Sequence, residues 1–207
     1  MATIVEFKDY SMGFKDDDGK VFNLLDRLCL RVEAGKALGV VGESGCGKSM
    51  TSLSAMRLLP DAATVQGGEI LLEGEDLLQM SEEEMRRVRG NKLAMIFQEP
   101  MTSLNPVYRI GNQIVEAIRT HEKVSKAEAK DRAVDLLRKV GIPSPEARIN
   151  DYPHQRSGGM RQRVAVLRAM RMDADFLLLD EPFRGLDAGT KKKTMNYIRC
   201  LLYTSPS

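Results

Sequence analysis

The sequence of 207 residues predicts an α/β fold, and three features of the chain lead to this prediction. An apolar run, Ala37–Val41, leads into a glycine-rich loop that is followed by a helical pattern. A second apolar run, Phe176–Leu179, ends in two carboxylates. Between them, at about residues 101–165, lies a mainly helical block. We therefore expect a parallel sheet with helices, an antiparallel β subdomain before it and an inserted helical subdomain.

The glycine-rich loop is the segment with the clearest chemistry. Gly42-Glu43-Ser44-Gly45-Cys46-Gly47-Lys48-Ser49 fits the pattern G-x-x-x-x-G-K-[ST]. Ala37–Val41 predicts a buried parallel strand before it, and Ser49–Leu59 predicts a helix after it. Glycines let backbone N–H groups turn toward a phosphate, and the helix N-terminus adds partial positive charge. Lys48 would reach the β- and γ-phosphates of a nucleotide, and the Ser49 hydroxyl would ligate Mg²⁺. The alternative, a glycine turn that matches by accident, is disfavoured by the strand and helix around it.

Composition narrows the possible functions. Hydrophobic residues make up 43% and charged residues 29%, as in globular proteins that bury a core. The net charge of +2 gives no case for a nucleic-acid partner. Cys29, Cys46 and Cys200 lack metal-like spacing, which indicates reduced thiols. No signal peptide and no membrane-spanning run is expected, so any membrane role would come through a partner.

The segment before the loop predicts antiparallel strands. Ile4–Phe7 and Leu28–Val32 have strand patterns, and Asp16–Gly19 predicts a hairpin turn. Phe14, on the same segment, could stack on a base or lie in the core. The residues alone favour the core.

Between the loop and the helical block, the pattern predicts short elements. Gly67-Gly68 predicts a break in the chain before a short strand, Glu69–Leu72. Ser81, followed by three glutamates, predicts the N-cap of a helix that ends at Val88. Leu93–Phe97 predicts a buried strand that leads to Gln98. Ligands bind at this end of parallel strands, although a simple loop glutamine would fit equally well.

The helical block has two segments with a period near 3.6, Val107–His121 and Lys126–Val140. Gly141–Pro143 ends the second of them. Ser157-Gly158-Gly159 then precedes a further helix to about Met172. Its backbone N–H groups could form a second anion site. An N-cap with a flexible turn is the alternative, and the residues alone favour it.

The second apolar run has the pattern of a strand that carries catalytic carboxylates. Phe176–Leu179 is followed at once by Asp180 and Glu181. Asp180 would hold Mg²⁺ through water, and Glu181 would act as general base on the attacking water. A solvated Asp-Glu turn is the alternative, which the phosphate loop in the same chain disfavours.

Taken together, these motifs resemble the ATP-binding subunits of ABC transporters. Five segments occur in that family's order: the loop at Gly42, the strand ending in Gln98, the signature Ser157-Gly158-Gly159-Met160-Arg161-Gln162, the strand ending in Asp180-Glu181, and a D-loop-like Gly185-Leu186-Asp187. The resemblance covers residues 1–199. Phe97–Pro106 and Tyr152–Gln155 are most similar to the dipeptide, oligopeptide and nickel importers.

This resemblance implies an ATP hydrolase that powers an importer for peptides or nickel. Two subunits would close head-to-tail around two ATP molecules, with Ser157 and Gly159 of one subunit contacting the γ-phosphate held by Lys48 of the other. Gln98 would sense the γ-phosphate and Mg²⁺, and Phe14 would stack on adenine, which reverses the preference above. The implied ligands of ATP are Phe14, Gly42, Glu43, Ser44, Gly45, Cys46, Gly47, Lys48, Ser49, Met50, Gln98, Ser157, Gly158, Gly159 and Asp180. The implied catalytic residues are Lys48, Gln98 and Glu181, and the implied Mg²⁺ ligands are Ser49, Gln98 and Asp180.

The resemblance also implies partners and a location. The residues after Gln98, with the helical block, would grip a coupling helix of a membrane permease. An extracytoplasmic substrate-binding protein would act through that permease. The subunit would therefore lie at the cytoplasmic face of the membrane as a peripheral protein.

Several departures from the family pattern suggest alternatives. Arg156 stands where the signature usually begins with Leu, and Phe183-Arg184 replaces a small polar pair. From about residue 164 the chain is more similar to another ABC branch. The family's switch histidine, expected well beyond Asp180, is absent, and the tail Cys200–Ser207 resembles translated adapter sequence. One alternative is therefore a C-terminally truncated or chimeric product that binds ATP with little hydrolysis. Another is a soluble ABC ATPase without a permease, which the importer-like residues near Gln98 disfavour.

Overall fold

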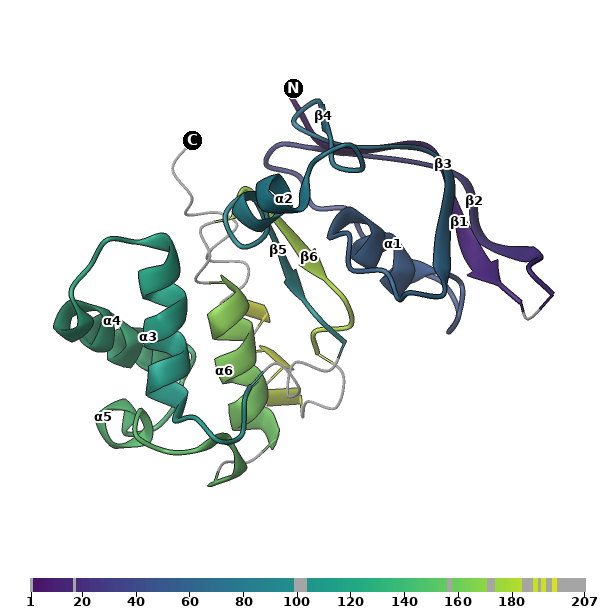
Figure 1. Cartoon of the computed structure of the whole chain (residues 1–207). Coiled ribbons are helices and arrows are strands. Elements are labelled where there is room, and N and C mark those ends of the chain that lie inside the picture. The colour runs from purple at the N-terminus through teal and green to yellow at the C-terminus, as the bar shows by residue number, and fades with distance from the viewer. Residues whose placement is uncertain are drawn as a thin grey trace. The chain divides into compact units, whose positions relative to one another are not determined.

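The computed structural model describes residues 2–16, 18–98, 104–155, 158–170 and 174–183, and the pairs 188–189, 191–192 and 195–196. It gives no side-chain description for residues 121, 162, 165, 166 and 168–170. The chain forms two compact units (Figure 1). The N-terminal unit is Met1–Arg89, and the C-terminal unit is Gly90–Ser207.

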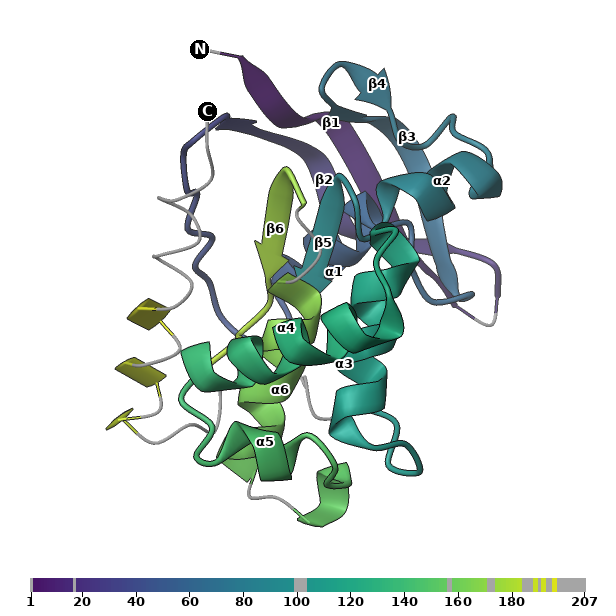
Figure 2. The ribbon, with the colours of Figure 1, turned by 90° about the vertical axis from the view of Figure 1, so that its left-hand side faces the viewer.

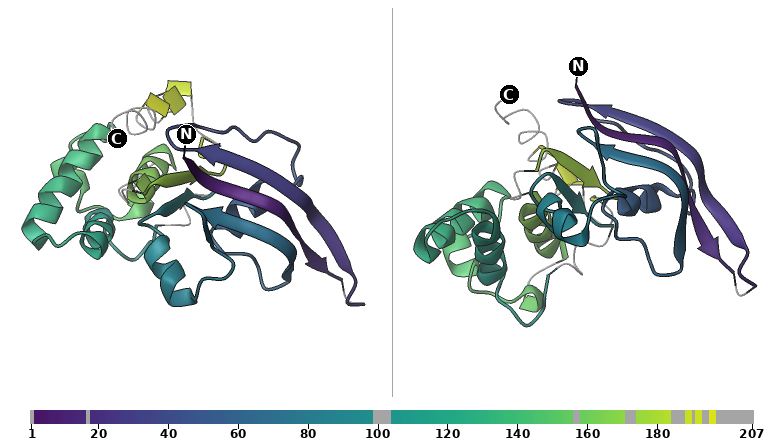
Figure 3. Two further views of the ribbon diagram at one scale, coloured as in Figure 1. Left: turned by 90° about the horizontal axis from the view of Figure 1, so that it is seen from above. Right: turned by 45° about the horizontal axis from the view of Figure 1, so that its top comes forward.

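The N-terminal unit is built on a four-stranded antiparallel sheet with the order β2-β1-β3-β4. Its strands are β1 (Thr3–Lys15), β2 (Val21–Glu33), β3 (Ala63–Leu72) and β4 (Glu75–Asp76). The three long strands run side by side and curve together (Figure 3). Val5, Phe7, Tyr10 and Met12 of the central strand are buried and supply much of the core. The antiparallel β subdomain that the sequence predicts is therefore present, with longer strands than expected.

In this unit the sequence predicts a hairpin turn at Asp16–Gly19 and a break in the chain at Gly67-Gly68, and the second prediction is wrong. At Asp16–Gly19 the chain does turn, with the Gly19 N–H donating to the Asp16 carbonyl at 3.0 Å. Gly67-Gly68 does not break the chain, because both residues lie inside β3. Gly68 has φ +87°, and a Cβ there would come within 2.5 Å of the Tyr10 Cα. The pair thus marks an irregularity where two strands approach closely, which only glycine allows.

Two helices complete the described part of the N-terminal unit, α1 (Lys48–Ala55) and α2 (Glu82–Val88). The predicted N-cap of α2 is confirmed. The Ser81 hydroxyl accepts the Glu84 N–H at 3.3 Å, and the Glu84 carboxylate accepts the Ser81 N–H at 2.7 Å. This reciprocal pair satisfies two N–H groups that the first turn of a helix leaves unpaired. After α2, the Arg89 Nε donates to the Met56 carbonyl at 2.8 Å, which ties the ends of the two helices together.

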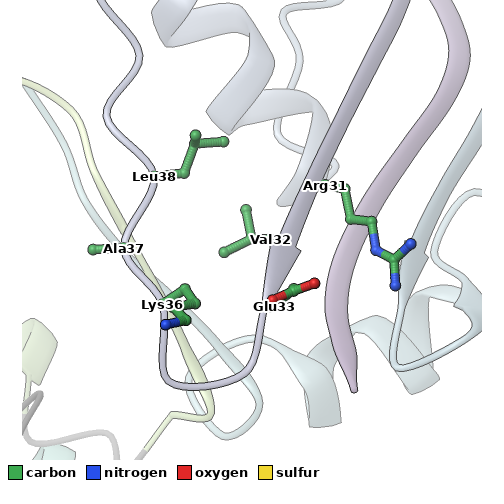
Figure 4. Close-up of a pocket in the computed structure, with 6 residues that line it drawn as sticks. All are labelled: Arg31, Val32, Glu33, Lys36, Ala37 and Leu38. Atoms are coloured by element: carbon green, nitrogen blue, oxygen red, sulfur yellow. The ribbon is translucent and has the colours of Figure 1, made fainter. Parts of the chain in front are cut away.

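The strand predicted at Ala37–Val41 is not formed among the described residues. Leu38 is 51% exposed, and Val41 is 93% exposed. A pocket of about 250 Å³ separates the start of this run from β2, and the side chains of Val32 and Leu38 point into it from its two sides (Figure 4). A parallel strand is stable only when a neighbour accepts and donates its backbone hydrogen bonds. No described strand does so here, and the apolar run stays extended and exposed.

In the C-terminal unit, the two predicted strands are confirmed and pair with each other. β5 (Leu93–Ile96) and β6 (Phe176–Leu179) are parallel, in a register that runs from Leu93 opposite Phe176 to Ile96 opposite Leu179. All four residues of β5 are buried. A short run that is apolar throughout is typical of a strand covered on both faces.

The other described elements of the C-terminal unit are helical, as predicted. Its elements are α3 (Ile110–His121), α4 (Lys126–Lys139), α5 (Pro145–Arg148), the 3₁₀ turn η2 (Pro153–Gln155) and α6 (Gly158–Met170). Figure 2 shows α3, α4 and α6 gathered around one core. That core contains Leu104, Ile110, Ile114, Ile118, Ala129, Ala133, Leu136, Leu137, Val140, Ile142, Ile149, Val164 and Leu167. In the part of the chain that the structure describes, no helix has the length and apolarity needed to cross a membrane.

Candidate functional site

The glycine-rich loop is closed around the ammonium group of Lys48. The Lys48 Nζ donates to the carbonyl oxygens of Gly42 at 2.7 Å and Glu43 at 2.6 Å, and it lies 3.5 Å from the Cys46 sulfur. An ammonium group has three donors, and these three contacts all come from the loop. The cation is therefore held inside the loop, where an incoming phosphate would meet it.

The shape of the loop depends on glycine at two positions. Gly45 has φ +87° and Gly47 has φ +94°, a left-handed conformation that strains any residue with a side chain. A Cβ on Gly47 would also lie 2.6 Å from the Leu25 side chain of β2. Gly47 is the N-cap of α1, and the Thr51 N–H donates to its carbonyl at 2.8 Å. The loop thus leads directly into a helix N-terminus, which favours anions.

Three further predicted ATP ligands lie in the N-terminal unit. Ser49 and Met50 are half-buried in the first turn of α1. Phe14 is half-buried on β1, where it pairs with Phe22 on one side and Ala63 on the other. Phe14 therefore lies beside the turn of the β1–β2 hairpin. The proposed contacts of these residues with adenine, phosphate or Mg²⁺ stay predictions.

The two carboxylates after β6 differ sharply in environment. Asp180 is 8% exposed, and its N–H donates to the Ile96 carbonyl at 3.0 Å, which extends the pairing with β5 by one residue. Glu181 is exposed and has φ +44°, in the left-handed region that is strained for a residue with a side chain. The chain therefore turns abruptly between a buried carboxylate and an exposed one.

Gln98 is brought to the same edge of the sheet as these carboxylates. Its side-chain amide donates to the Glu181 carboxylate at 3.1 Å, across 83 positions in the sequence. Parallel neighbouring strands end at the same edge, so residues that follow β5 and β6 meet there. Within the described residues, no group of three or more His, Cys, Asp or Glu side chains could hold a metal ion. Asp180, Glu181 and Gln98, which we call the carboxylate cluster, instead bring two carboxylates and one amide to this edge.

The signature segment is described only in part. Gly158 and Gly159 form the start of α6. Arg156 and Ser157 lie outside the described residues, as do Glu99–Ser103 and Arg184–Asp187. The tail Cys200–Ser207 also lies outside them. The sequence predictions for these residues therefore stay predictions.

The chain is similar to curated proteins of known class. Residues 25–184 match the family model described as ABC transporter. The "Probable peptide ABC transporter ATP-binding protein y4tR" of Sinorhizobium fredii is 45% identical over 94% of this chain and 58% of its own length. The "Oligopeptide transport ATP-binding protein OppD" of Bacillus subtilis is 45% identical over 97% of this chain and 56% of its own. The chain thus spans little more than half the length of these relatives.

Solved structures agree with the predicted fold class. A dimeric ATP-binding cassette in a post-hydrolysis state, bound to ADP and Pi, has a TM-score of 0.84 and 23% identity, over 97% of this chain and 83% of its own. A dimeric bacterial ABC transporter cassette has a TM-score of 0.84 and 24% identity, over 96% and 83%. At this level of identity, the likeness supports the fold alone. With the family match over residues 25–184, we conclude that this chain belongs to the ABC transporter family.

Proposed function

We propose that this chain is the ATP-binding and ATP-hydrolysing part of a subunit that powers a peptide importer. The observation that carries the proposal is the closed loop with the Lys48 ammonium at its centre. The names of the relatives support the substrate class, because those compared above are peptide and oligopeptide transport proteins. They favour peptides over nickel.

ATP would bind through its phosphates to the loop and to the N-terminus of α1. Backbone N–H groups at Gly45, Gly47 and Ser49 are of the kind that cradle phosphate oxygens. Lys48 would exchange its two carbonyl partners, Gly42 and Glu43, for phosphate oxygens. The exchange is favourable, because a hydrogen bond between two charged groups is stronger than one to a neutral carbonyl.

Glu181 would be the general base. Its carboxylate takes a proton from water as the water oxygen bonds to the γ-phosphorus and the bond to ADP breaks. Gln98 holds this carboxylate through the 3.1 Å hydrogen bond and so orients it before water arrives. When bound, Mg²⁺ adds positive charge beside the phosphate oxygens. Asp180 would hold such an ion, since Mg²⁺ binds through carboxylate oxygens and this carboxylate is 8% exposed at the strand end, and Ser49 and Gln98 would supply further oxygen ligands.

The wider assembly is also part of the proposal. A second ATPase subunit would pair head-to-tail with this one, and Ser157, Gly158 and Gly159 would contact its ATP. The helical residues at about 101–165 would contact the permease, which places the subunit at the cytoplasmic face of the membrane. We assign the ATP-binding domain to residues 1–199 and leave 200–207 outside it. This part of the proposal rests on the order of the motifs along the chain.

The test is the substitution Glu181→Gln. It removes the base but keeps a side chain of the same size, so we expect phosphate release to fall by about 100-fold or more while ATP affinity stays the same. The ATP-bound dimer should then accumulate, which size-exclusion chromatography with ATP would detect. Asp175→Asn, at an exposed carboxylate just before β6, is the matched control and should turn over like wild type. Undiminished turnover by Glu181→Gln would show that another residue is the base.

A further inference from the structure

The C-terminus of helix α4 is closed by two backbone hydrogen bonds, and two carbonyl groups follow its last turn. The Gly141 N–H donates to the Arg138 carbonyl at 3.0 Å, and the Ile142 N–H donates to the Leu137 carbonyl at 2.9 Å. With φ +72° at Gly141, these two bonds form a Schellman motif. The next carbonyls, of Val140 and Gly141, lie at the negative end of the helix dipole, where a cation is favoured.

Arg163 of α6 supplies that cation. Its Nη1 donates to the Val140 carbonyl at 3.1 Å and to the Gly141 carbonyl at 2.8 Å. Its Nε donates to the Gly159 carbonyl at 3.3 Å, one turn earlier in α6. A Cβ on Gly141 would lie 3.4 Å from the same Nη1, an ordinary van der Waals contact, so the guanidinium lies directly against this residue. One side chain therefore links the end of α4 with the first turn of α6.

This link matters because α6 begins with two glycines. Glycine loses more conformational freedom on ordering than any other residue, so a Gly-Gly start is a weak helix start. Val164 and Leu167 are buried and anchor the apolar side of α6 after its first turn, and Met160 packs against the same core from within that turn. Arg163 adds a polar contact to the Gly158-Gly159 turn itself, because its Nε donates to the Gly159 carbonyl.

We propose that Arg163 is a positioning residue for the signature segment: it holds the backbone of Gly158 and Gly159 in place before a phosphate of the partner subunit's nucleotide arrives. The inference rests on the proposed function, in which the backbone N–H groups of Gly158 and Gly159 contact the phosphate of the partner subunit's ATP. Backbone donors bind an anion more tightly when they are ordered beforehand, because binding then does not have to order them. Arg163 itself has no contact with ATP in this account.

The experiment compares three variants with the wild-type chain. Arg163→Met removes the donors and keeps an apolar stem, and Arg163→Lys keeps the charge but not the planar fork. Arg138→Met is the matched control, because Arg138 lies in the last turn of α4 and pairs with Asp135 and Glu146 on the surface. The first measurement is amide hydrogen exchange without nucleotide. We expect exchange at Gly159–Val164 to rise about tenfold or more in Arg163→Met, less in Arg163→Lys, and not in Arg138→Met.

The second measurement separates positioning from a merely structural role. In a Glu181→Gln background, we measure ATP affinity at low protein concentration and the protein concentration needed for ATP-driven dimerisation. Arg163→Met should keep the ATP affinity and raise the dimerisation concentration about tenfold, since the signature acts only across the dimer. The dimerisation concentration of Arg163→Lys should lie between those of the wild-type chain and Arg163→Met.

The outcomes distinguish the two proposals. Wild-type hydrogen exchange in Arg163→Met overturns the positioning role, and so does faster exchange with unchanged dimerisation. If Arg163→Met does not fold, Arg163→Lys decides by the same two measurements, and wild-type values in both overturn the inference. A wild-type chain that binds ATP but does not dimerise contradicts the proposed function instead, while the exchange measurement still reports whether Arg163 orders this turn.

Discussion

Two apolar runs of this chain, Leu93–Ile96 and Ala37–Val41, are both predicted to be buried strands, but only the first forms one. Leu93–Ile96 pairs with a neighbour and is at most 6% exposed. No described strand pairs with Ala37–Val41, and three of its residues are more than half exposed. Hydrophobicity thus predicts that a segment can become a strand, whereas a partner decides whether it does. The comparison shows which features of the site are local and which depend on the sheet.

The polar segments that follow the two runs also differ in whether they depend on strand pairing. The loop after Val41 is closed by contacts between residues two to six positions apart and by glycine conformations. It can form without a paired strand before it. The contact between Gln98 and Glu181 spans 83 positions and depends on the register of β5 and β6. The phosphate loop is therefore a local structure, and the carboxylate cluster is a tertiary one.

The largest expected effect comes from truncating one leucine in each run. Leu93→Ala removes a fully buried side chain and should lower the free energy of unfolding by about 2–5 kcal/mol. Leu38→Ala removes a half-exposed side chain and should change it by less than about 0.5 kcal/mol. Urea denaturation of the two variants measures both values. A cost at Leu38 equal to that at Leu93 would mean that Ala37–Val41 is buried in solution.

A smaller effect is expected at the N-cap of α2, which is local and should not depend on either run. Ser81→Ala removes the acceptor for the Glu84 N–H and should destabilise the protein by about 1 kcal/mol. Urea denaturation at neutral pH measures this value. A change as large as that in Leu93→Ala would show that the cap is not a local feature.

The same cap predicts a pH dependence. Hydrogen bonds from the side chain and backbone of Ser81 lower the pKa of Glu84 below its ordinary value of 4.5. A carboxyl group whose pKa is lower in the folded state stabilises the fold above its unfolded pKa. That contribution is lost as the pH falls from about 4.5 through the folded value. The loss of stability on acidification should be smaller in Ser81→Ala, and an identical acid titration would count against the capping box.

Much of the fold follows from sequence patterns, because its elements are periodic and locally capped. The helices around Ile114 and Leu137 and the strand at Leu93 were all predicted. The strand through Gly68 was not, because turn propensity at a Gly-Gly pair competes with a close strand–strand approach that only the sheet reveals. The exposure of Val41 was not foreseen either, because the periodicity of a segment does not say whether another strand pairs with it.

In the candidate site, too, local features were predicted from the sequence and contacts between distant segments were not. The loop around Lys48 and the strand that ends in Asp180 and Glu181 were predicted from motifs of a few residues. The roles of Arg89 and Arg163 were not, because each bonds to helix-end carbonyls more than 20 positions away. The available signal was indirect: an arginine one turn after Gly158-Gly159, and a glycine that ends the helix before it. Such contacts depend on how helices pack, which short patterns do not specify.

The central claim is that ATP binds this chain through Lys48, and titration calorimetry with ATP tests it most directly. Lys48→Ala removes the charged donor at the centre of the loop and should weaken binding by several kcal/mol, or about 100-fold or more. Lys36→Ala, at an exposed lysine of the same unit, is the control and should bind like wild type. Loss of affinity in Lys48→Ala alone is the result that our account predicts. Equal ATP affinity in wild type and Lys48→Ala would contradict it.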